Sequence, residues 1–84
     1  MLYHALRRIV METFIVITYD GENLRQIGPV FNTYGAAACA MTTAVAAFNG
    51  YENPADLPDY KKCEIDGEWK QDERIWKIFG NVRK

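Results

Sequence analysis

The stretch Thr33–Gly50, TYGAAACAMTTAVAAFNG, decides the fold of this 84-residue chain. Thr33 is a suitable N-cap, because its hydroxyl can accept from the first unpaired amides of a helix. Asn49-Gly50 is a typical helix end, since glycine readily adopts a left-handed backbone. Apolar residues between them recur at the spacing of one helix face: Tyr34, Ala37, Met41, Ala44, Val45 and Phe48. The pattern predicts a helix over Tyr34–Phe48.

The residues before this helix predict a β-hairpin. Glu12–Asp20 (ETFIVITYD) is rich in β-branched and aromatic residues and is apolar on both faces, as in a central strand. Asp20-Gly21 favours a tight turn, and Asn23–Gly28 is the expected return strand. Pro29 cannot donate a hydrogen bond to a neighbouring strand, so it should end this strand or lie on a sheet edge.

The residues after the helix predict a loop and two further strands. Tyr51–Asp59 (YENPADLPD) carries two prolines and three acids and is expected to be a loop. Tyr60–Ile65 is expected to be a strand that ends in a turn at Asp66-Gly67. Arg74–Val82 (RIWKIFGNV) is expected to be the last strand, although its apolar spacing also fits a helix.

Together these elements predict a small single α+β domain over residues 1–84, a ββαββ-like antiparallel sheet of about four strands with one packed helix. Residues 1–11 are a candidate N-terminal extension, because Met11 fits a native start as well as Met1 does. The expected core residues are Ile15, Ile17, Leu24, Met41, Val45, Phe48, Ile65, Trp76 and Ile78.

Composition and motifs argue against catalysis. Ten Lys and Arg against eleven Asp and Glu give a net charge of −1, which excludes a strongly basic nucleic-acid coat. The chain has no serine, one histidine, no phosphate-binding glycine loop and no closely spaced pair of Cys or His ligands. We therefore expect no enzyme activity, no cofactor and no metal. Cys39 and Cys63 lack disulfide-type spacing, so we expect reduced thiols and a cytoplasmic protein. We also expect no membrane partner.

The 26 residues from Gln26 to Tyr51 carry no charge. A solvated helix face normally carries Lys, Glu or Arg, so the outer face of the predicted helix favours a docking surface. One alternative is a helix buried on both sides by its own chain. A membrane span is the other, although the stretch is at the short limit for crossing a bilayer and its alanines and threonines partition weakly. The expected function is a non-catalytic protein–protein interaction module whose partner is another protein or a second copy. The expected partner-binding residues are Gly35, Cys39, Thr42, Thr43, Ala46 and Ala47, with an acidic rim of Glu52, Asp56 and Asp59.

A second hypothesis is single-stranded nucleic-acid binding. Basic residues that alternate with aromatic residues on a sheet face are typical of such proteins. The residues that would contribute are Lys61, Lys62, Trp69, Lys70, Arg74 and Trp76. The acids interspersed among them weaken this reading, so nucleic acid is the second choice of partner.

In general build the chain resembles the small ββα-containing proteins of phages and mobile elements. Some of these, including anti-CRISPR and anti-restriction inhibitors, act by covering the surface of a host protein. The resemblance implies an inhibitor of that kind, but it extends to no particular residue and transfers no site.

Overall fold

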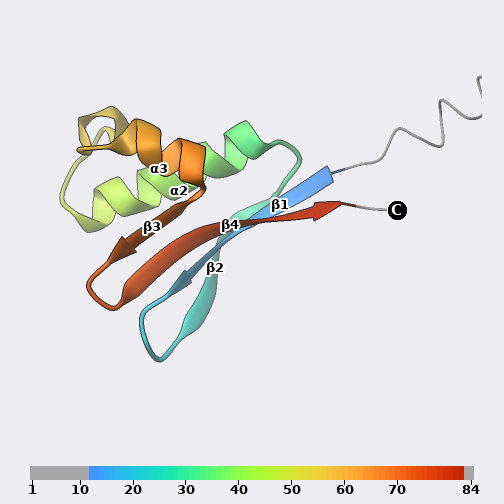
Figure 1. Cartoon of the computed structure of the whole chain (residues 1–84), viewed down its shortest axis with the longest axis horizontal. Coiled ribbons are helices and arrows are strands. Elements are labelled where there is room, and N and C mark those ends of the chain that lie inside the picture. The colour runs from blue at the N-terminus through green and yellow to red at the C-terminus, as the bar shows by residue number, and fades with distance from the viewer. Residues whose placement is uncertain (1–11, 83–84) are drawn as a thin grey trace, which may run out of the picture.

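The computed structural model describes residues 12–82 and contains one four-stranded antiparallel sheet with two helices packed on it (Figure 1). The strands are arranged in the order β2-β1-β4-β3, and every neighbouring pair is antiparallel. The predicted α+β class is confirmed. Along the chain the elements are β1 (Glu12–Tyr19), β2 (Leu24–Phe31), α2 (Tyr34–Phe48), the 3-10 turn η1 (Pro54–Asp56), α3 (Tyr60–Asp66), β3 (Glu68–Gln71) and β4 (Arg74–Val82).

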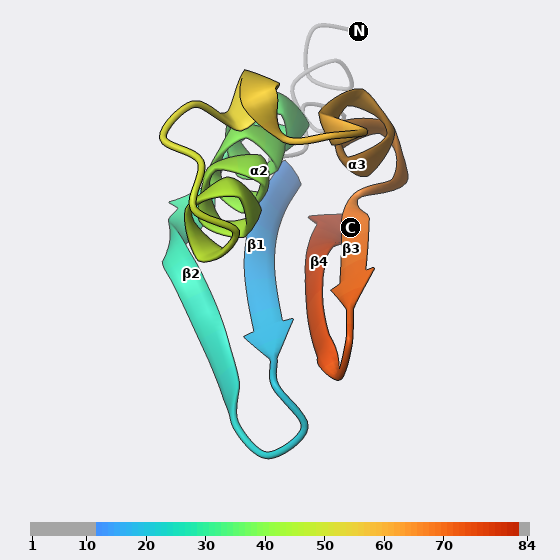
Figure 2. The same cartoon turned by 90° about the vertical axis from the view of Figure 1, so that its left-hand side faces the viewer.

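Helix α2 has the predicted bounds and the predicted cap. The Thr33 side chain accepts a hydrogen bond from the Ala36 amide at 3.1 Å, and Gly50 adopts a φ of +87° just after the helix. Both helices lie on the same face of the sheet (Figure 2). The core therefore forms between α2 and strands β1 and β4, and its buried residues are Val16, Ala37, Ala38, Met41, Val45, Ala46, Leu57, Cys63, Trp76 and Ile78.

The strand predictions for the two ends of the chain are confirmed. Strand β1 lies between β2 and β4, as its two apolar faces indicate, and Arg74–Val82 forms β4 rather than a helix. Strand β2 continues past Gly28 to Phe31 with a shift of register, and Gly28 there has a φ of +73°. Pro29 is tolerated because β2 is an edge strand.

The prediction of a strand at Tyr60–Ile65 is wrong, because this segment is helix α3. An ion pair of 2.7 Å joins Lys62 to Asp66 one turn later, a favourable spacing on a helix. Gly67, expected in a hairpin turn, ends the helix with a φ of +66°. The hairpin turn lies instead at Asp72-Glu73, between β3 and β4.

Three residues expected in the core are largely exposed: Leu24 at 67%, Phe48 at 53% and Ile65 at 80%. Ile65 is displaced because its segment is a helix that buries only Cys63. Leu24 lies on the sheet face opposite the helices, where Ile15 and Ile17 are half-buried. Met41, Val45, Trp76 and Ile78 are core residues as predicted.

The proposed N-terminal extension, residues 1–11, lies outside the described residues. Within residues 12–82, no helix has the length and apolar content needed to cross a bilayer.

Candidate interaction surfaces

The sheet face that carries no helix is largely apolar. Side chains alternate between the two faces along a strand, so the residues that neighbour the buried Val16, Trp76 and Ile78 point away from the helices. These outward residues line a shallow depression of about 660 Å³. We call this surface the open sheet face and define it by Ile15, Ile17, Tyr19, Leu24, Ile75 and Phe79.

The arrangement is unusual because an antiparallel sheet covered on one side normally presents polar residues to water on the other. Here both central strands are apolar outward as well as inward. Tyr19 is 40% exposed and Phe79 is 46% exposed. No element among the described residues covers this face (Figures 1 and 2). A contiguous exposed apolar surface of this kind is typical of interaction sites in general.

Along the described strands, the charged residues that face the open side are Glu68 and Lys70 on β3 and Lys77 on the neighbouring strand β4, and they are paired with one another. Glu68 lies between Lys77 and Lys70, at 3.1 Å and 3.2 Å. Hydrogen bonds from these two lysines hold the pKa of Glu68 below its ordinary value. The Lys77 ammonium is thereby drawn from the centre of the sheet toward β3, and its aliphatic stem remains beside the apolar residues. The result is an apolar centre with a paired polar border, as in protein interfaces.

The predicted outer face of α2 does not exist as one surface. Thr42 and Ala46 are each only 1% exposed, so their assignment to that face is wrong. The segment with η1 and α3 packs against α2 on a second side, so the alternative of a helix covered by its own chain holds in part. The exposed members of the set are Gly35, Cys39, Thr43 and Ala47, with the loop residues Glu52, Asp56 and Asp59. That these residues bind a partner stays a prediction.

The residues proposed for nucleic-acid binding do not share a sheet face. Lys61 and Lys62 are on α3, whereas Lys70 points to the open side of β3. Trp76 is 2% exposed and cannot stack on a base. Trp69 packs against the core, and its ring N–H donates to Gln71 Oε1 at 3.1 Å. The expectation of a Lys- and Trp-bearing sheet face is therefore wrong.

Arg74, the remaining member of that set, has a structural role. Its guanidinium lies 4.8 Å from the centre of the Phe48 ring and 5.6 Å from that of Trp76, and Asp20 lies 3.9 Å away. These contacts join the end of α2 to the sheet. Beside them a cleft of about 490 Å³ opens, and Thr18 lines it.

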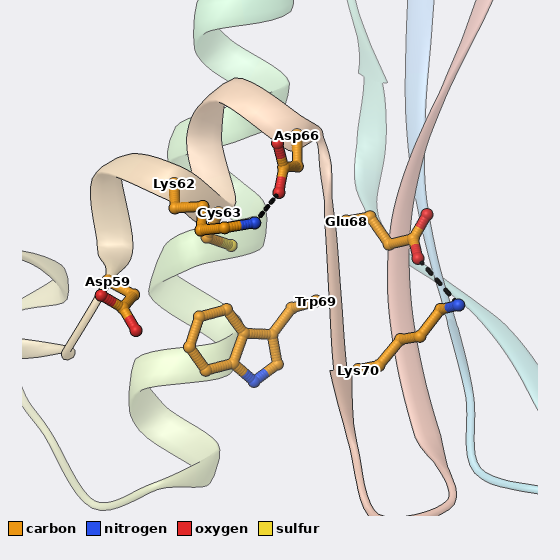
Figure 3. A pocket seen from close by; sticks show the side chains of 7 residues that line it. All are labelled: Asp59, Lys62, Cys63, Asp66, Glu68, Trp69 and Lys70. Carbon is orange, nitrogen blue, oxygen red and sulfur yellow. Dashed lines mark hydrogen bonds and ion pairs between the residues drawn. The ribbon is translucent and has the colours of Figure 1, made fainter.

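A second cleft of about 490 Å³ lies between α3 and β3 (Figure 3). Figure 3 shows Lys62 paired with Asp66 and Lys70 paired with Glu68 along its sides. Burial raises the pKa of the Cys63 thiol to about 11, so the thiol is protonated and a poor nucleophile at neutral pH. Both lysines of this cleft are therefore ion-paired, and its thiol is protonated.

Sequence reasoning missed the open sheet face because it assigned Ile15, Ile17 and Leu24 to the core. The signal that could have identified the surface is a count of layers. A single 15-residue helix can cover only one face of the sheet, whereas β1 and β4 are apolar on both.

Comparison with known proteins adds no relative: no family model matches the chain, and neither curated proteins nor solved structures give a significant match.

Proposed function

We propose that this protein is a non-catalytic protein–protein interaction module that docks through the open sheet face. The observation that carries the proposal is the group of outward apolar side chains on β1 and β4, with Lys77 among them and with no covering element among the described residues. Burying apolar area contributes about 25 cal/mol per Å². A partner that covers this face therefore gains the main driving force of protein association.

The contacting surface of the partner is a protein surface with an apolar centre. The outward residues of the two central strands offer one charge, that of Lys77, and Glu68 already neutralises it. A nucleic acid needs unpaired cations to neutralise its phosphates, and this face offers few. We assign the module to the cytoplasm, because both cysteines are free thiols.

Four exposed aromatic residues allow a matched test by photo-crosslinking. A photoreactive phenylalanine analogue replaces Tyr19 or Phe79 on the open sheet face. The control positions are Phe48 and Tyr51, which are 53% and 37% exposed on the helix-bearing side. Each variant is irradiated in cells that produce the chain, and adducts are identified by mass spectrometry.

The proposal predicts one discrete adduct, the same from Tyr19 and from Phe79, and none from the control positions. Adducts from Phe48 and Tyr51 alone would move the interface to the helix side. The absence of a discrete adduct from all four positions would refute an interaction module.

A further inference from the structure

We infer that the partner on the open sheet face is a second copy of this chain, so that two sheets stack face to face as a symmetric dimer. The inference rests on the proposed function and adds the identity of the partner. In a twofold interface the same patch occurs on both sides. An apolar face of one copy therefore meets an apolar face of the other, without a second specialised protein.

The size of the face fits a weak dimer. Eight-residue strands are about 27 Å long, and four strands about 4.8 Å apart span about 19 Å. The flat footprint is therefore about 500 Å², or less where β3 is short. A standard interface takes about 800 Å² from each partner, and smaller ones are transient. We expect a dissociation constant on the order of 1–100 μM.

The strand order also fits twofold stacking. The apolar residues are centred on β1 and β4, the two middle strands of the sheet. A twofold axis that runs along the strands places β1 of one copy over β4 of the other. Because this axis keeps each residue at its height along the strands, Ile15 then faces Phe79 of the second copy and Tyr19 faces Ile75, at the usual separation of about 10 Å between stacked sheets. Ile17 lies over the aliphatic stem of Lys77.

Charge placement is compatible with the same arrangement. This axis lays the charged β3 border of one copy over β2 of the other, where the outward residues Leu24 and Gln26 are uncharged. Lys70 of one copy is thereby kept away from Lys70 of the other. The two Lys77 residues, one from each copy, lie near the axis, and Glu68 of the same copy pairs with each of them.

The sheet edges favour face packing over edge pairing. Edge strand β2 has a shifted register, a left-handed Gly28 and Pro29, which interrupt the row of hydrogen-bonding groups. Edge strand β3 has only four residues. Short, irregular edges of this kind resist the addition of another strand.

The test is solution mass by light scattering over a concentration series from about 1 μM to 1 mM, a range that brackets the expected dissociation constant. Phe79→Lys and Leu24→Lys each place two charges in the interface, one from each copy. Ile65→Lys is the matched control, because Ile65 is an exposed isoleucine on α3. We expect a concentration-dependent dimer for the wild type and Ile65→Lys, and a dissociation constant raised more than a hundredfold in the other two.

Circular dichroism confirms that each variant is folded, and a chain that starts at Met11 completes the set. A dimer that survives both Phe79→Lys and Leu24→Lys overturns the inference. So does a dimer seen only for the chain from Met11, since residues 1–10 would then be the occupant of the face. A monomer at every concentration, with crosslinks from Tyr19 to a different protein, refutes self-association and leaves the proposed function standing.

Discussion

Replacing Thr18 by valine should stabilise the protein, although Thr18 is buried in the middle of the sheet. Thr18 is 3% exposed, and its hydroxyl has no hydrogen-bond partner among the described residues. A buried polar group without a partner costs about 1–3 kcal/mol. Valine has nearly the same shape and favours strands, so Thr18→Val should raise the free energy of unfolding by about 1 kcal/mol.

Thr42 supplies the matched control, because it is equally buried but its hydroxyl is paired. The Thr42 hydroxyl donates to the carbonyls of Ala38 and Cys39, at 3.0 Å and 3.1 Å. Thr42→Val removes these bonds and should lower the free energy of unfolding by about 0.5–1 kcal/mol. The two variants are isosteric changes with opposite expected signs.

Thermal unfolding followed by circular dichroism, at one protein concentration, separates these outcomes. For a domain of this size about 1 kcal/mol shifts Tm by about 4–8 °C. We expect Thr18→Val to melt above the wild type and Thr42→Val below it. A Thr18→Val variant that melts as low as Thr42→Val would refute the reasoning, because the Thr18 hydroxyl would then have a partner.

Three further predictions concern other positions. Gly67→Ala should lower the free energy of unfolding by about 1–3 kcal/mol, because the φ of Gly67 is +66° and an added Cβ would lie 2.8 Å from the Tyr34 hydroxyl. Measured by urea unfolding, this loss should be smaller when Tyr34 is also replaced by phenylalanine. An equal loss in both backgrounds would contradict the contact. The amides of Asn23 and Glu22 lower the pKa of Asp20 below its ordinary value of 3.8. The Asp20 carboxylate therefore contributes stability above that value, and this contribution is lost as pH falls through the lower pKa of the folded state. Asp20→Asn should flatten the acid side of the profile of stability against pH, and an unchanged profile would contradict this. A maleimide should label the exposed Cys39 in the native protein and the buried Cys63 only after unfolding. Mass spectrometry of the labelled peptides checks this, and rapid labelling of Cys63 in the native protein would be inconsistent with its burial.

The elements predicted correctly are those that local chemistry specifies. Helix α2 begins at the Thr33 cap and ends before Gly50, so its bounds follow from residues within or beside it. Strand β4 follows from its aromatic and β-branched content. In both cases intrinsic preference and tertiary packing favour the same structure.

Helix α3 could not be predicted in the same way, because it is short and its contacts are distant in sequence. Seven residues are too few to form a stable helix alone. The helix is held by the hydrogen bond from the Tyr34 hydroxyl to the Glu64 carbonyl and by the burial of Cys63 against α2. The Gly67 carbonyl then accepts from the Ile78 amide at 2.9 Å, which joins the helix end to β4.

The candidate site was only half predictable. The apolar character of β1 on both faces is visible in the sequence, and so is the uncharged stretch around α2. Which of the two surfaces remains uncovered depends on where the 53–66 segment packs. That segment packs beside α2, so the helix loses Thr42 and Ala46 from its outer face while the sheet keeps its own outer face free.

Oxidative footprinting by hydroxyl radicals tests the central claim, that the open sheet face is the docking surface, most directly. Tyr19 and Phe79 report on this face, and Phe48 and Tyr51 report on the helix-bearing side. Oxidation of each residue is measured by mass spectrometry for dilute purified protein and for the protein inside cells. We predict that Tyr19 and Phe79 are protected in cells while Phe48 and Tyr51 react equally in both samples. Protection of Phe48 and Tyr51 without protection of Tyr19 and Phe79 would contradict the account.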